Sequence, residues 1–377
     1  RDNPYIIGYP PLLSRADQAS RIESNRQEMQ LRYSLDFDAL GHTHSLDMGV
    51  HRQTADYLRS ENGTDRLGSS TRRSGNIEGT GAYAETTLRG PGGLALNAGV
   101  RANRLASDYR DEKYDQVCVS YFPPSGCVQG YLPQNASRNT WNNQAYELGL
   151  TWEASPSQVF FASGSRHFRA PNIDELALAA ADLRPQHGVT AEVGMRLKPG
   201  SGTELSATLF GMRIQDEIYY GQAPTTGASL NRNYDAPTRR LGGELQGRWR
   251  LAASLTLNAN LAYVQPRFEG TDADVPHVPR WTANAHLEWH ARDALRLFAT
   301  ARHVGARYDG NDLTNRDFPV LPTYTVYDLA ARYVLRDIEI TAAVNNLFDK
   351  VYSTVGYSAT YYPMPGRNYA LSLLWRF

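Results

Sequence analysis

A strict alternation of polar and apolar residues recurs along almost the whole chain and limits what it can fold into. From Met29 to Phe37 every second residue is apolar, and Trp281 to Trp289 repeats the pattern with tryptophan at both ends. Successive side chains of a β-strand point to opposite faces, so this period predicts strands. A soluble sheet with one buried face also alternates, so a single segment does not decide the fold class.

The composition of the two faces separates a membrane sheet from a soluble one. The polar faces carry Arg, Glu, Asn and His in strand after strand, whereas the apolar faces carry Leu, Ala and aromatic residues, with aromatics near the ends. Lipid-facing strands with aromatic girdles require this distribution. A soluble β-sandwich or propeller would need an apolar inner face instead. No apolar run approaches the roughly 18 residues of a membrane helix.

Fifteen such segments can be delimited, and short connections between them alternate with long ones. They are residues 26–40, 42–57, 73–89, 92–110, 141–154, 158–169, 189–198, 203–220, 232–251, 255–268, 279–291, 295–308, 323–335, 338–350 and 366–377. Short turns on one side and long loops on the other are typical of a transmembrane, antiparallel, up-and-down β-barrel of the outer membrane. The longest expected loop covers residues 111–140.

The odd number of strands indicates an incomplete barrel. Single-chain bacterial barrels have an even strand number, and counting back from Phe377 places residues 1–25 on the long-loop side. We therefore expect residues 1–377 to be the carboxyl-terminal portion of one barrel domain. Plugged transporters have about 22 strands, so about seven strands and the plug domain would lie outside this sequence.

Charge and motifs exclude several classes of function. Lys and Arg (39) balance Asp and Glu (39), which argues against a nucleic-acid partner, because such proteins carry an excess of basic residues. The chain has no nucleophile elbow, Walker A motif, H-E-x-x-H or dinucleotide fingerprint, so we expect no enzyme and no catalytic residues. The sequence assigns no metal ligands and no cofactor, because the convergence of its nine histidines cannot be read from it.

The two cysteines lie in one short segment. Cys118 and Cys127 are separated by eight residues that include two prolines and a glycine. A zinc site would need about four ligands, so the pattern predicts a disulfide rather than a metal site, with two free thiols as the alternative. A bridge closing so small a loop would contribute roughly 2–3 kcal/mol and implies an oxidising compartment.

Three segments resemble the TonB-dependent outer-membrane receptors, and the similarity extends over essentially the whole chain. They are VNNLFDKVYS (Val344 to Ser353), YYPMPGRNYALSLLWRF (Tyr361 to Phe377) and GSRHFRAPNIDEL (Gly164 to Leu176), the last being similar to the family's FRAP-type segment. The chain departs from the family at Gln186, where relatives often have glutamate.

The resemblance implies a location and a transport function. It implies energy-coupled import of a scarce metal complex, usually a ferric siderophore, across the outer membrane of a Gram-negative bacterium. The implied partners are outer-membrane lipid, a plug domain, the remaining barrel strands and a TonB-type energy-transducing protein. The alternatives are a passive pore or structural barrel, or the same receptor class with haem, cobalamin or another small ligand. A haem receptor of this family is expected to have a histidine between Pro171 and Pro185, and none is present.

Loop aromatics are the candidate ligand contacts, because they supply a large contact area at low entropic cost. They are Tyr121, Phe122, Tyr308, Tyr357, Tyr361 and Tyr362. Arg169 of the FRAP-type segment either contacts a ligand carboxylate or the plug, or has a structural role at the end of its strand. Inner-face arginines such as Arg32 and Arg302 either attract an anionic chelate or pair with acidic residues.

Overall fold

The computed structural model describes residues 20–62, 70–121, 124–177, 179, 183–200, 202–222 and 229–376. Fifteen strands form one antiparallel sheet that follows chain order. They are β1 (Ser20–Ala39), β2 (His42–Asn62), β3 (Ser70–Arg89), β4 (Leu94–Tyr121), β5 (Pro124–Ser155), β6 (Gln158–Arg169), β7 (Gln186–Gly200), β8 (Thr203–Gln215), β11 (Thr238–Ala252), β12 (Leu255–Phe268), β13 (Trp281–Arg292), β14 (Leu295–Val304), β15 (Tyr324–Leu335), β16 (Ile338–Asn345) and β19 (Asn368–Trp375).

Short elements lie in the connections between these strands. Two hairpins, β9 (Ile218–Gln222) with β10 (Ser229–Asn233) and β17 (Ser353–Tyr357) with β18 (Thr360–Pro363), form separate two-stranded sheets. The α-helix α1 (Ile173–Ala177) follows β6, and the 3₁₀ turn η1 (Pro91–Gly93) precedes β4. Among the described residues, no helix has the length and apolar character needed to cross a bilayer.

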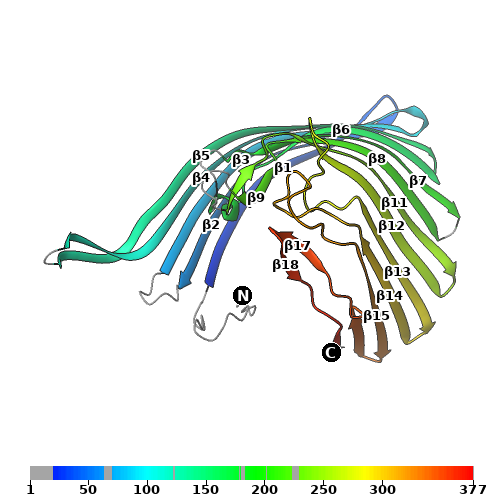
Figure 1. The fold of residues 1–377 in the computed structure, drawn as a ribbon. Coiled ribbons are helices and arrows are strands. Elements are labelled where there is room, and N and C mark those ends of the chain that lie inside the picture. Colours follow the sequence, from blue (N-terminus) through cyan, green and yellow to red (C-terminus); the bar gives the residue numbers. More distant parts are fainter. Residues whose placement is uncertain are drawn as a thin grey trace.

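The sheet is strongly curved and open. It forms an arch, with the β17–β18 hairpin and several loops on its concave side (Figure 1). The strand order begins at β1 and ends at β19, and no pairing among the described residues joins these two edges. Side chains on both faces of β19 are exposed, as are those of β1 from Arg21 to Ala39.

The alternating pattern places apolar side chains on the convex face. Leu209, Val193 and Leu245 are more than half exposed there. Tyr263 and Trp281, whose rings lie 4.6 Å apart, mark one margin of this apolar band, and Trp289 lies eight residues further along β13. At about 3.4 Å per residue this separation spans about 27 Å, close to the roughly 25 Å apolar band of outer-membrane barrels.

All fifteen predicted segments correspond to strands of the sheet, but several predicted boundaries were wrong. The segments 203–220 and 232–251 were expected as two long strands, whereas β8 ends at Gln215, β11 begins at Thr238 and the β9–β10 hairpin lies between them. The predicted strand 338–350 ends at Asn345. Asn346, which follows it, has a positive φ of 51°, so the extended backbone ends there.

The prediction of a long loop at 111–140 was also wrong. β4 and β5 continue as a paired hairpin as far as Tyr121 and Pro124. Alternation of polar and apolar residues fades in this stretch because neither face needs to be apolar outside the bilayer, although the ladder of hydrogen bonds still forms. The register places Cys118 directly opposite Cys127, a separation that suits a disulfide. Their side chains are outside the described part of the structure, so the disulfide stays a prediction.

Candidate functional site

Three loops meet at the end of the sheet opposite its short turns. They follow β12, β14 and β16, and backbone hydrogen bonds join them. The Tyr308 carbonyl accepts from the His277 amide at 3.0 Å, and the Gly356 carbonyl accepts from the Gly310 amide at 2.9 Å. His277 Nε2 lies 2.7 Å from the same Gly356 oxygen. We call these segments, residues 269–280, 305–323 and 346–367, the loop cluster.

A small apolar core anchors the loop cluster to the sheet. Tyr234, Phe268 and Val275 are buried together, with Tyr219 packed against them. The Tyr219 and Tyr234 rings stack at 4.1 Å, and the Tyr234 ring meets Phe268 edge-on at 4.8 Å. Burial raises the pKa of Tyr219, because removal from water disfavours its phenolate. The β9–β10 connection is thereby packed against the loop after β12.

Asp309 holds the turn of the β17–β18 hairpin. Its side chain is fully buried, and its carboxylate accepts from the Ser358 amide at 2.8 Å and the Ala359 amide at 3.1 Å. It also accepts from the Asn311 amide at 3.0 Å. Ser358 and Ala359 have positive φ values of 50° and 60°, as a tight hairpin turn requires. One carboxylate therefore fixes the orientation of the hairpin that carries three of the predicted tyrosines.

Arg307 and Asp312 complete this network. The Arg307 guanidinium donates to the carbonyls of Ser353 (2.6 Å) and Thr354 (2.8 Å) and lies 5.5 Å from the centre of the Tyr324 ring. Burial lowers the pKa of Arg307 from its ordinary value. The fully buried Asp312 carboxylate accepts from backbone amides of residues 316–318 at 2.9–3.4 Å. These charge-assisted bonds order a loop that has little apolar core of its own.

The aromatic side chains of the loop cluster divide into two groups. Tyr357 is half-buried, and its ring meets those of His277 (4.9 Å) and Tyr220 (6.2 Å) nearly edge-on. Burial raises the pKa of Tyr357 and lowers that of His277. Tyr361 and Tyr362, on β18, are 40% and 53% exposed. The first group packs within the cluster, whereas the second leaves aromatic surface exposed.

The structure brings together four of the seven predicted ligand contacts. Tyr308, Tyr357, Tyr361 and Tyr362 all belong to the loop cluster. The Tyr121 side chain and the whole of Phe122 lie outside the described residues.

Arg169 lies elsewhere, at the end of β6. Its guanidinium contacts Glu175 at 2.8 Å and Gln186 at 3.2 Å. The Glu175 carboxylate also accepts from the Asn172 amide, and Asn172 Oδ1 accepts from the Glu175 amide, which forms a capping box for α1. Arg169 thus contacts the segment that follows its own strand.

The sequence alone did not identify Tyr220 and His277 as contacts of Tyr357. It also did not identify Asp309 and Asp312 as acceptors for backbone amides of the loops. Tyr220 meets the same criterion as the other loop tyrosines, but it was expected inside a strand. Asp309 to Asp312 read DGND, a turn signal. That signal shows where the chain bends but not which amides a carboxylate reaches from 49 positions away.

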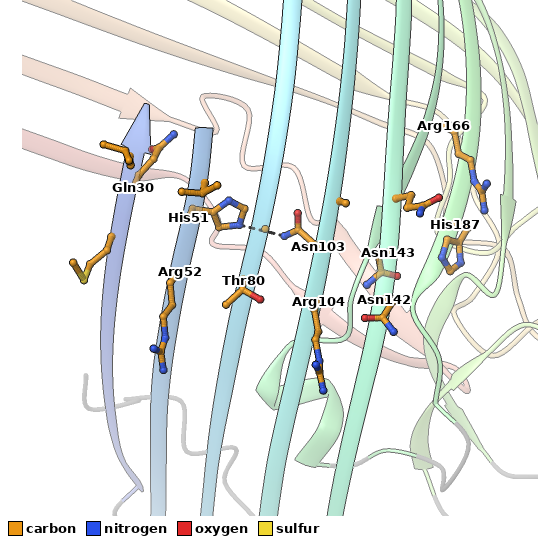
Figure 2. Close-up of a pocket in the computed structure, with 16 residues that line it drawn as sticks. Gln30, His51, Arg52, Thr80, Asn103, Arg104, Asn142, Asn143, Arg166 and His187 are labelled. Atoms are coloured by element: carbon orange, nitrogen blue, oxygen red, sulfur yellow. Dashed lines mark hydrogen bonds between the residues drawn. The ribbon is translucent and has the colours of Figure 1, made fainter. Parts of the chain in front are cut away.

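The concave wall carries a polar network. Arg101 Nε donates to Asn103 Oδ1 at 2.8 Å, and both side chains approach His51 Nε2, at 3.2 Å and 3.3 Å. Figure 2 shows the His51–Asn103 interaction, which crosses the intervening strand β3 at Gly81. Within the part of the chain that is described, no group of three or more His, Cys, Asp or Glu side chains could hold a metal ion.

Most of the predicted inner-face arginines have acidic partners. Arg32 contacts Asp47 at 2.6 Å, Arg302 contacts Asp328 at 3.5 Å, and Arg332 contacts Glu339 at 3.1 Å. Of the two alternatives for these groups, pairing within the barrel is the one observed. They therefore contribute less to a positive field than a count of arginines indicates.

An open antiparallel sheet with long loops on one side, an apolar convex face and a polar concave face matches a known family. Residues 2–347 match the family described as TonB dependent receptor-like, beta-barrel. The chain belongs to this family. It is an outer-membrane β-barrel chain of the receptor class, as the sequence predicted.

Similar proteins include an iron-regulated outer-membrane protein and receptors named for ferric compounds. The chain is 27% identical over 248 residues to the iron-regulated outer membrane virulence protein of Vibrio cholerae, covering 59% of this chain and 38% of that protein. It is 24% identical over 345 residues to the ferric enterobactin receptor of Pseudomonas aeruginosa, covering 82% and 43%. Among solved structures, the closed form of the ferric-catecholate import receptor Fiu from Escherichia coli superimposes with a TM-score of 0.74 at 18% identity, covering 95% of this chain and 55% of Fiu.

These coverages show that the chain spans less than half the length of the curated relatives named above. Sequence identity to Fiu is low enough that the superposition shows a common fold alone.

Proposed function

We propose that residues 1–377 form the carboxyl-terminal portion of the barrel of an energy-coupled outer-membrane receptor that imports a metal chelate, most concretely a ferric siderophore. The main support is the loop cluster, which holds the exposed Tyr361 and Tyr362 on a hairpin fixed by Asp309. A passive pore has no need of such an ordered aromatic surface. Relatives named as ferric enterobactin and catecholate receptors support the same class of ligand.

The proposed ligand suits the chemistry of this surface. Siderophore chelates present planar, frequently aromatic faces, and offset or edge-on ring contacts contribute about 0.5–1.5 kcal/mol each beyond the burial of their area. Tyr361 and Tyr362 occupy successive positions on a short strand, so their rings leave opposite faces of the hairpin. One ring can therefore contact the chelate while the other borders the adjoining loop surface. Arg169, already paired with Glu175, is left with a structural role in this proposal.

The proposed partners follow from the open sheet. In lipid, the unpaired backbone groups along β1 and β19 would each cost several kcal/mol, so further strands of the same barrel are expected to pair with both edges. The polar concave face then surrounds a plug domain, and a TonB-type protein supplies energy to release it. A transport role rather than catalysis fits the absence of a catalytic motif in the sequence.

Uptake of labelled chelates by cells that carry the full-length gene tests this proposal. We expect accumulation of a ferric catecholate that stops when the proton gradient is collapsed. Uptake that continues at full rate without the gradient would support the passive pore. Energy-dependent uptake of cobalamin or haem, with none of any iron chelate, would keep the receptor class and contradict the proposed substrate.

A further inference from the structure

The convex face of the sheet carries an unusual cluster of basic residues. Arg52 on β2, Arg104 on β4 and Arg166 on β6 line one groove of about 1030 Å³, together with Asn142 and His187 (Figure 2). The three arginines belong to the convex face because they alternate with concave-face neighbours such as His51 and Asn103. All three side chains are exposed.

Each arginine lies at the same kind of boundary. On each strand it is the first charged residue of the convex face after a run of apolar or small residues. The preceding convex-face residues are Leu46, Met48 and Val50 on β2, Leu96, Ala98, Val100 and Ala102 on β4, and Phe160, Ala162 and Gly164 on β6. Arg166 also pairs in register with Tyr146. The three guanidinium groups therefore lie where the hydrocarbon layer gives way to lipid head groups.

The charges of these arginines are not neutralised within the structure. None of the three makes a hydrogen bond or ion pair with any residue that the structure describes. Thr80 of β3 lies directly opposite both Arg52 and Arg104. The nearest carboxylate on the convex face by register is Glu78, two residues from Thr80 on the same strand. Glu78 itself has no described partner. By contrast, Arg213 on the same face is held by Glu269 through two bonds of 2.7 Å and 2.9 Å.

The groove also has an apolar part directly beside the arginines. Met29, Leu31 and Val50 line it on β1 and β2, and all three are more than half exposed. A basic rim above an apolar floor, at the margin of the bilayer, complements an amphiphile with an anionic head and hydrocarbon chains. Nearby amide side chains such as Asn142 and Gln144 offer neutral donors to the same head group.

We propose that this groove binds a lipid of the outer leaflet that carries more than one phosphate, with its phosphate groups distributed over Arg52, Arg104 and Arg166 and its acyl chains along Met29, Leu31 and Val50. Guanidinium groups bind phosphate through paired N–H donors, so charge and geometry both favour this head group. The site is separate from the loop cluster and does not depend on which chelate the protein imports.

Native mass spectrometry of the full-length protein in a non-ionic detergent tests the site, with bisphosphorylated lipid A as the probe. We expect the triple variant Arg52→Gln/Arg104→Gln/Arg166→Gln to bind at least about tenfold more weakly. Lipid A stripped of its phosphates should bind the unaltered protein with a similar loss. Arg213→Gln is the matched control, because that guanidinium is on the same face but already paired, and its binding should stay within about twofold.

Unchanged affinity in the triple variant, or equal binding of the dephosphorylated lipid, would overturn the proposal. Displacement of the lipid by millimolar inorganic phosphate would assign the groove to free phosphate and also overturn it. If the triple variant fails to assemble, the three single variants should each lose about two- to fivefold, and three unaltered affinities would contradict the site.

Discussion

The fifteen-stranded sheet and the loop cluster are stabilised in different ways. In the sheet, each strand satisfies its backbone hydrogen bonds through the neighbouring strands. A side chain there needs mainly to be apolar on the outer face or polar on the inner face. In the loop cluster, single buried side chains such as Asp309 and Arg307 satisfy backbone groups from distant segments. A residue in the sheet can therefore be replaced by another of the same polarity. A buried polar residue of the loop cluster can be replaced only by a side chain that places the same hydrogen-bonding groups in the same positions.

The largest effect is expected from a charge on the lipid face of the sheet. Leu245 faces outward between Arg239 and Trp249 on β11. Leu245→Arg should destabilise the full-length barrel by about 2–4 kcal/mol, because arginine near the bilayer midplane is costly. The neighbouring Gln246→Arg, on the concave face beside Glu192 and Glu244, is the control and should change the stability little. Urea titration of both variants in lipid bilayers measures the difference, and equal losses would contradict the assignment of the faces.

Removal of the predicted disulfide should act on one hairpin alone. The Cys118→Ser/Cys127→Ser variant is expected to lower the local opening free energy of the β4–β5 tip by roughly 2–3 kcal/mol. The barrel should melt as before, because its stability comes from ladder hydrogen bonds and lipid burial. Hydrogen exchange at the tip measures the local effect. Efficient thiol labelling of the unaltered protein without reductant would show that no bridge forms.

A buried cap in the loop cluster should have a smaller but still local effect. Asp309→Ala leaves the amides of Ser358 and Ala359 without their acceptor, which costs about 1–3 kcal/mol. We expect faster hydrogen exchange in the β17–β18 hairpin and unchanged exchange in β8 and β11. Asp309→Asn keeps one acceptor oxygen, so exchange in its hairpin should be faster than in the unaltered protein and slower than in Asp309→Ala. Loss of exchange protection throughout the sheet would show that the two regions are not independent.

The smallest expected effect depends on pH. Burial depresses the pKa of His277, so its unfolded form binds protons at pH values where the folded form does not. The contribution of His277 is therefore complete above the unfolded value of 6.5 and is lost as the pH falls from there through the depressed folded pKa. The protection factors of the His277 and Gly356 amides, which compare each amide with an unstructured one at the same pH, should fall on acidification, and His277→Gln should remove that dependence. A fall in protection that persists in His277→Gln would assign it to another group.

The same contrast explains what the sequence predicted well. Residues alternate from Met29 to Phe37 and from Trp281 to Trp289 because one face of each strand contacts lipid and the other is polar. Fifteen strands could therefore be counted from the sequence. Where the bilayer ends, that requirement ends, and the paired stretch from Asp111 to Tyr121 was mistaken for a loop.

The loop cluster was predictable only in outline. Its tyrosines could be chosen because loop aromatics are frequent ligand contacts. The bonds from Asp309 to Ser358 and from Arg307 to Ser353 join positions more than 40 residues apart. No local pattern encodes such pairs, so the arrangement of the tyrosines became visible only in three dimensions.

The central claim is that recognition lies in the loop cluster while the sheet serves membrane insertion. Equilibrium binding of a ferric catecholate to the full-length protein tests it most directly, in Tyr361→Ala/Tyr362→Ala and in Tyr333→Ala. Tyr333 is 44% exposed, like the loop tyrosines, but lies on the outward face of β15. The account predicts about a three- to tenfold loss of affinity for the loop variant, from the one ring that contacts the chelate, and none for Tyr333→Ala. Unaltered affinity in the loop variant, with an intact barrel, would contradict it.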